Sequence, residues 1–251
     1  MACHSAVDRG EAALDRGDLL TAEQEFRSAL ADNPDNQQAL YGVGWTFHLA
    51  HEETAARETF EQLRSRFPES ALGYRGMGSI LFGQGDLAAA RTQLNLAVAK
   101  APDDVRASQT LALLDLAEGK TDDALRRIDA AIGVAAESSE LHQTRALVLV
   151  QTGRGDEALS EVEQAVQLAD SPRQVSTAEV TRARALVSQV EGRVDPGHCE
   201  GAQAVRAWLE QADQALDRAQ VTGVNEEQVA AERGDVRRAR TLVSDACPGG
   251  K

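Results

Sequence analysis

The hydrophobic and polar positions of the chain follow a helical pattern that returns at a fixed interval. The stretch EQEFRSALADNPDN, residues 23–36, is typical of a helix that runs into a stop. Similar stretches, RETFEQLRSRFPES and RTQLNLAVAKAPDD, begin 34 and 68 residues later, so Pro34, Pro68 and Pro102 fall in step. The pattern therefore predicts a chain built from repeated helical segments.

The period extends beyond the prolines and alternates small with large side chains. Small residues let two helices approach closely, and large apolar residues fill the space between them. The in-step sets are Ala22, Ala56, Ala90, Ala124 and Ala158; Ala29, Leu63, Ala97, Ala131 and Ala165; Gly10, Gly44, Gly78, Ala112 and Ala146; and Phe26, Phe60, Leu94, Ile128 and Val162. Gly17, Gly85, Gly119 and Gly153 mark a turn inside each unit, so each repeat is predicted to be a pair of packed helices.

Composition agrees with an all-α chain, and the charge narrows the choice of partners. Aromatic residues make up only 4% of the 251 residues, and runs of strand-forming residues are absent. The formal net charge of −14 argues against nucleic acid or an anionic lipid surface as the main partner, because both require Lys and Arg. No apolar stretch is long enough to span a bilayer, and the start MACHSAVDRGE lacks the features of a signal peptide. The chain is therefore expected to be cytosolic or to have lost an export signal.

These residues resemble the tetratricopeptide repeat, in which a first helix, a Gly turn and a second helix with a closing Pro recur every 34 residues. The resemblance covers residues 3–172 and implies five regular repeats within 1–172. Residues 173–251 are predicted to form a degenerate sixth repeat and C-terminal capping helices, with Gly234 as a possible break in the last helix. The expected fold is one continuous right-handed α-solenoid of stacked antiparallel helix pairs, with about six repeats.

The resemblance implies a protein-binding scaffold whose concave groove is lined by the first helix of each repeat. We expect an apolar or amphipathic segment of a partner to bind there. The alternative is that the same side chains only pack against neighbouring repeats. The groove positions of the family correspond here to Tyr41, Trp45, Leu49, Leu72, Arg75, Phe82, Leu113, Leu116, Leu147 and Val150.

Two other kinds of site are not expected from the sequence. Val7, Glu11, Gly42, Leu72 and Gly76 stand where chaperone-binding members of the family carry the Lys, Asn and Arg that grip a terminal carboxylate. Catalytic motifs such as HExxH, GxSxG or a phosphate loop are missing, so no enzyme, cofactor or metal site is predicted. His48 and His51 lie one turn apart, but His51 occupies the position of the turn glycine and is read as a loop residue.

The positions of the three cysteines are relevant to the cellular compartment in which the protein is found. Cys199 precedes one predicted long helix and Cys247 follows another, so a helical hairpin would bring the two together in a disulfide, which requires an oxidising environment. The alternative is two unrelated thiols in a cytosolic protein. Cys3 is placed like the lipid-modified first residue of a mature bacterial lipoprotein.

Taken together, the layout is similar to that of outer-membrane lipoproteins with tetratricopeptide repeats. The type IV pilus pilotins are such proteins, with about six repeats, and they assist assembly of the secretin pore. This resemblance implies a periplasmic protein at the outer membrane whose partner is a secretin or another subunit of an envelope complex. The alternative is a cytosolic adaptor or regulatory protein.

Overall fold

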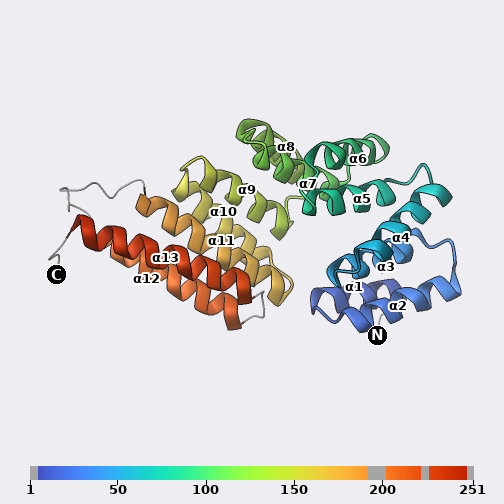
Figure 1. Ribbon diagram of the computed structural model, residues 1–251, viewed down its shortest axis with the longest axis horizontal. Coiled ribbons are helices and arrows are strands. Elements are labelled where there is room, and N and C mark those ends of the chain that lie inside the picture. Colours follow the sequence, from blue (N-terminus) through green and yellow to red (C-terminus); the bar gives the residue numbers. More distant parts are fainter. Residues whose placement is uncertain (1–4, 192–201, 222–225, 248–251) are drawn as a thin grey trace. The chain divides into compact units, whose positions relative to one another are not determined.

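The computed structural model describes residues 5–191, 202–221 and 226–247, and within these ranges it is all helical (Figure 1). The all-α prediction of stacked helix pairs is therefore confirmed. The thirteen helices of the described residues are α1 Ala6–Asp15, α2 Leu19–Asp32, α3 Gln37–Leu49, α4 Glu53–Arg66, α5 Ala71–Gly83, α6 Leu87–Lys100, α7 Val105–Ala117, α8 Thr121–Val134, α9 Ser139–Gln151, α10 Gly155–Leu168, α11 Pro172–Glu191, α12 Ala202–Val221 and α13 Glu226–Ala246.

The helices group into two compact units, Met1–Arg127 and Ile128–Lys251. In the first unit, α1 packs on α2, α3 on α4 and α5 on α6, and α7 follows α6. Successive pairs also touch through their first helices, because α1 contacts α3, α3 contacts α5 and α5 contacts α7. The first helices therefore form one layer of this unit, which we call the first-helix layer.

The turn inside each repeat depends on one residue with left-handed backbone. Gly17, Gly85, Gly119 and Gly153 have φ values of 73°, 78°, 75° and 70°, and His51 takes the same conformation at φ 61°. Glycine adopts this conformation without the steric cost that a Cβ atom brings. The interpretation of His51 as the loop residue of its repeat is confirmed, and its backbone is strained relative to the four glycines.

Two phenylalanine rings fill the space between the first helices of the first unit. A Cβ atom added to Gly42 of α3 would lie 2.5 Å from the ring of Phe26, and one added to Gly76 of α5 would lie 2.4 Å from the ring of Phe60. Both rings are almost completely buried. The glycines of α3 and α5 therefore make room for the aromatic side chains of α2 and α4.

The second unit is built around α9 to α13. Helix α9 packs on α10, α11 on α12, and α13 lies against both α11 and α12. Its core joins Val180, Leu186 and Val190 of α11 to Leu209 and Leu216 of α12, with Trp208 partly buried beside them. Helix α13 presents one apolar stripe to this core, formed by Val229, Val236, Ala239 and Val243.

The last helix is continuous through Gly234, so the possible break at this residue does not occur. An added Cβ atom at Gly234 would meet no atom closer than 3.5 Å. A glycine inside a helix costs only about 1 kcal/mol relative to alanine. The burial of the apolar stripe of α13 outweighs that cost.

The structure tests the alanine positions of the repeat pattern, whereas other sequence predictions stay predictions. Ala22, Ala56, Ala90, Ala124 and Ala158 are all fully buried, as the repeat pattern predicts. The division at residue 172 and the single continuous solenoid stay predictions. Cys3 and Cys199 lie outside the described residues.

Candidate functional site

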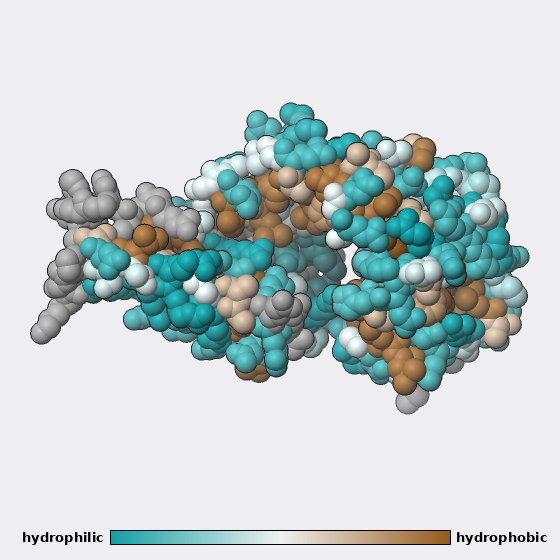
Figure 2. Space-filling model, viewed as in Figure 1, coloured by the Kyte–Doolittle hydropathy of each residue, from teal (hydrophilic) through white to brown (hydrophobic). Residues whose placement is uncertain are grey.

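The predicted groove residues of the first unit lie in its first-helix layer, and most of them are partly buried. Trp45 and Leu49 lie on α3, Leu72, Arg75 and Phe82 on α5, and Leu113 and Leu116 on α7. Tyr41 is more deeply buried, with 9% of its surface exposed. Figure 2 shows apolar areas of limited extent on a mostly hydrophilic surface.

Tyr41 and Trp45 form a stacked aromatic pair on α3. Their ring centroids are 6.2 Å apart with an interplanar angle of 9°, and Tyr41 also contacts the buried Phe60 ring at 5.5 Å. The imidazole of His48 lies 5.1 Å from Trp45. Tyr41 is therefore a packing residue that stacks on Trp45, and Trp45 is the member of the pair with more exposed surface.

Arg75 of α5 contacts the Tyr41 ring and also pairs with Asp104 at the start of α7. Its guanidinium lies 4.4 Å from the centre of the Tyr41 ring, and its Nη1 donates to both carboxylate oxygens of Asp104 at 3.0 Å. Asp104 also caps α7 by accepting a hydrogen bond from the Ala107 amide. Burial opposes the charge of Arg75, but Tyr41 and Asp104 favour it, and the pKa of the guanidinium is raised. Because Asp104 already neutralises it, Arg75 is poorly suited to bind a carboxylate of a partner.

One ionic cluster of the first unit could not be inferred from the repeat pattern. Asp115 of α7 is 2% exposed and pairs with Arg91 of α6 at 2.7 Å and with Arg127 at 2.9 Å. Its in-step residues are apolar, namely Ala13, Phe47, Leu81 and Leu149. A buried carboxylate at this position requires the two arginines as partners.

The second unit places Leu147 and Val150 on α9, where they are partly buried. The neighbouring polar side chains of α9 are bonded within the unit. His142 Nδ1 lies 2.8 Å from Glu161, Arg145 pairs with Glu161 and with Asp129 at 2.7 Å, and Glu140 accepts a hydrogen bond from Gln174. No aromatic pair like Tyr41 and Trp45 accompanies Leu147 among the ring contacts found in the described residues.

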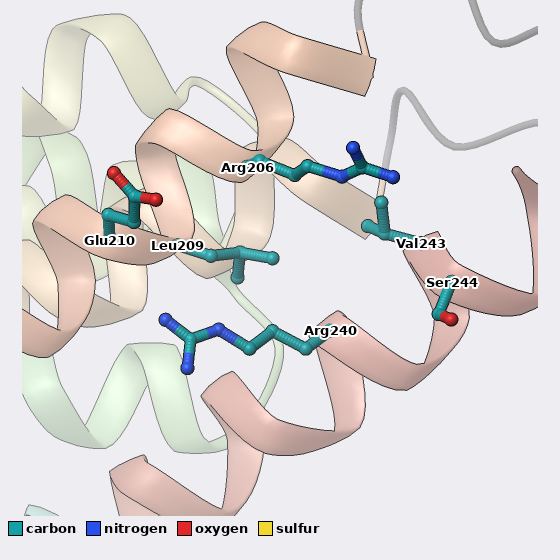
Figure 3. Close-up of a pocket in the computed structure, with 6 residues that line it drawn as sticks. All are labelled: Arg206, Leu209, Glu210, Arg240, Val243 and Ser244. Atoms are coloured by element: carbon teal, nitrogen blue, oxygen red, sulfur yellow. The ribbon is translucent and has the colours of Figure 1, made fainter. Parts of the chain in front are cut away.

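A pocket of about 340 Å³ lies between α12 and α13 (Figure 3). Its lining combines the apolar Leu209 and Val243 with the polar side chains of Arg206, Glu210, Arg240 and Ser244. The side chains of Arg206 and Arg240 run in opposite directions across it, with Leu209 between them. Arg240 pairs with Asp213 at 2.5 Å, so the two arginines do not converge on one anion site.

The described residues contain neither a metal-binding group nor a membrane-spanning helix. There, no group of three or more His, Cys, Asp or Glu side chains is placed to hold a metal ion. None of the described helices combines the length and the apolar character needed to cross a bilayer. His4 and His198 lie outside these residues.

Cys247 follows the last turn of α13, where its amide donates to the Val243 carbonyl at 3.0 Å. The residue is 6% exposed, and its sulfur is assigned to a disulfide. The expected partner, Cys199, lies outside the described residues, so the pairing of the two stays a prediction.

Comparison with models of protein families identifies the family to which this helical chain belongs. The family model described as tetratricopeptide repeat matches residues 7–53, 54–105 and 110–174, which together exceed half of the chain. The chain therefore belongs to the tetratricopeptide repeat family, a protein-interaction scaffold that binds protein partners. A search of curated proteins finds no match.

Solved structures with the same fold include several bacterial repeat proteins. A thermophilic tetratricopeptide repeat protein of Thermus thermophilus, TTC0263, is 22% identical with a TM-score of 0.62, over 72% of this chain and 97% of that chain. Pseudomonas aeruginosa PilF is 16% identical with a TM-score of 0.57, over 92% and 96% of the two chains. PilW, described as a widely conserved type IV pilus biogenesis factor, is 16% identical with a TM-score of 0.58, over 86% and 96%. At these identities the likeness concerns the fold alone.

Proposed function

We propose that the first-helix layer of the first unit binds an apolar or amphipathic segment of a protein partner, with Trp45 as the main anchor. The observation that carries the proposal is the aromatic pair on α3. Tyr41 contacts Phe60 and Arg75 and stacks on Trp45, which keeps part of its surface exposed. Tryptophan is among the side chains that most often dominate a protein interface.

The other predicted groove residues take part in this proposal in different ways. Leu49, Leu72, Phe82, Leu113 and Leu116 would extend the apolar contact, since each keeps some surface. Arg75 would act by supporting Tyr41. Leu147 belongs to the second unit, where a contact with the same partner is a separate hypothesis.

The proposed setting is the bacterial envelope, with a role like that of a pilotin and a secretin or another envelope subunit as partner. Two observations support it: the fold shared with PilF and PilW, and the disulfide assigned to Cys247. In this proposal Cys3 is the lipidated residue on the periplasmic face of the outer membrane. Mass spectrometry of the native protein would test this, because a Cys3 that carries no acyl chains contradicts the anchor. A cytosolic adaptor is the second candidate.

The central test is the variant Trp45→Ala. Removing a central aromatic anchor is expected to weaken partner binding by about thirtyfold, or about 2 kcal/mol. The measurement is the recovery of the partner with the purified protein from extracts of the native cells, alongside the circular dichroism spectrum of each variant.

Leu96→Ala is the matched control. Leu96 lies on α6, a second helix of the same unit, and is 41% exposed, so its truncation removes apolar surface away from the proposed site. We expect this variant to keep its partner. If Trp45→Ala folds and binds as well as the unchanged protein, the binding surface lies elsewhere; if it unfolds, Trp45 is a core residue.

A further inference from the structure

We infer that the partner segment is basic as well as amphipathic, with Lys or Arg residues flanking its apolar side chains. This inference rests on the proposed function, because it concerns the same first-helix layer. It is carried by the distribution of charge around the apolar residues at one end of that layer.

Four residues at this end, three of them apolar, form a row with the repeat spacing of 34. Leu14, His48, Phe82 and Leu116 stand in the last turns of α1, α3, α5 and α7, and each is partly buried. A Cβ atom added to Gly83 of α5 would lie 4.0 Å from the imidazole of His48, so the ends of α3 and α5 meet. His48 in turn touches Trp45. The row is therefore continuous with the proposed anchor.

Acidic side chains border this row. The turns that follow α1, α3 and α5 span residues 16–18, 50–52 and 84–86, and they carry three acidic side chains and one arginine. In the turn after α7 the corresponding residue is Lys120, which pairs with Glu118. Asp18, Glu52 and Asp86 occupy the same position in the three turns and are all exposed. We call these three residues the acidic margin. Hydrogen bonds from Thr21 lower the pKa of Asp18, which favours its charged form.

The positive charges of the first helices do not balance this margin. Arg9 of α1 is paired with Glu25, and Arg75 of α5 is paired with Asp104. Arg106 lies in the first turn of α7, at the opposite end of that helix from Leu116. An acidic segment docked on the row would meet like charge, whereas a basic one would meet complementary charge.

The test uses the full chain with Trp208→Phe, which leaves Trp45 as the sole tryptophan, since the chain has two. Two synthetic amphipathic peptides share leucines at helical spacing and carry either Lys or Glu at all other positions. Binding is followed by Trp45 emission at about 0.15 M salt, where charges more than ~8 Å apart are largely screened. We expect the Lys peptide to bind at least about tenfold more tightly than the Glu peptide.

Charge-neutralising variants separate the margin from the overall charge of the protein. The triple variant Asp18→Asn, Glu52→Gln and Asp86→Asn should weaken Lys-peptide binding about tenfold. The asparagines keep the side-chain acceptors that cap α2 and α6. The control triple variant Asp32→Asn, Glu58→Gln and Glu61→Gln removes three exposed charges from α2 and α4 and should change the affinity less than about threefold.

The outcomes distinguish this inference from the proposed function. Equal binding of both peptides at Trp45, or equal effects of the two triple variants, overturns the basic partner but leaves the docking surface. If neither peptide changes Trp45 emission, the docking surface itself is wrong.

Discussion

Replacing Gly76 by alanine is expected to lower the free energy of unfolding of the first unit by about 3 kcal/mol. The new Cβ atom would lie 2.4 Å from the ring of Phe60, which is fully buried and also packs against Gly44 of α3, where an added Cβ atom would lie 2.7 Å from the same ring. The ring cannot move toward α3 without a second clash, so α5 must shift. Overpacking of this kind typically costs 1–3 kcal/mol, and a ring held on both sides belongs at the upper end of that range. Urea denaturation followed by circular dichroism measures the effect.

Gly83→Ala is the matched control for this prediction. Gly83 lies on the same helix, is exposed, and its added Cβ atom would make only an ordinary contact at 4.0 Å. Alanine is the better helix former, so this variant should be neutral or more stable by up to about 1 kcal/mol. If both glycine variants have the same stability as the unchanged protein, the packing assigned to Phe60 is incorrect.

The sequence itself indicates how the loss can be compensated. One repeat later, the residues in step with Phe60 and Gly76 are Leu94 and Thr110, so a smaller side chain goes with a larger neighbour. The double variant Phe60→Leu, Gly76→Ala should therefore be more stable than the sum of the single effects implies. A coupling of about 1–2 kcal/mol in the double-mutant cycle is expected.

The helix pairs and their contacts could be predicted from sequence because the same small and large side chains pack together in each repeat. The fully buried Ala22 and Ala90 follow from the 34-residue period, and so does the left-handed backbone of His51. The course of α13 could not be decided. Gly234 is compatible with a turn and with a helix, and only the core that covers Val236 and Val243 favours the helix.

The candidate site was less predictable, because its properties depend on contacts between repeats. Tyr41 and Trp45, taken from the family positions, lie on α3, but those positions do not distinguish a supporting ring from an exposed one. The depth of Tyr41 results from Phe60 and Arg75, which lie 19 and 34 residues away in the sequence. The buried Asp115 was not predictable for the same reason. Its ion pairs with two arginines stand where the other repeats have an apolar side chain.

The geometry of α12 and α13 supports the predicted disulfide between Cys199 and Cys247. The two helices have 20 and 21 residues and pack against each other without a break in α13. Their pocket brings Arg206, near the start of α12, beside Val243 and Ser244, near the end of α13. The end of α13 therefore lies near the start of α12. A bridge from Cys247 to a residue just before α12 requires this arrangement.

Reduction of this disulfide is expected to lower the free energy of unfolding of the second unit by about 2–4 kcal/mol, because the open chain gains conformational freedom mainly in the unfolded state. Intact-mass measurement after thiol alkylation should show Cys199 and Cys247 protected until reductant is added, and peptide mapping should exclude a bridge to Cys3. The variant Cys3→Ser serves as the control and should keep the full stability under oxidising conditions. Free alkylation of both Cys199 and Cys247 in protein isolated without reductant from its native cells would refute the bridge, and the cytosolic adaptor would then be the better account of this chain.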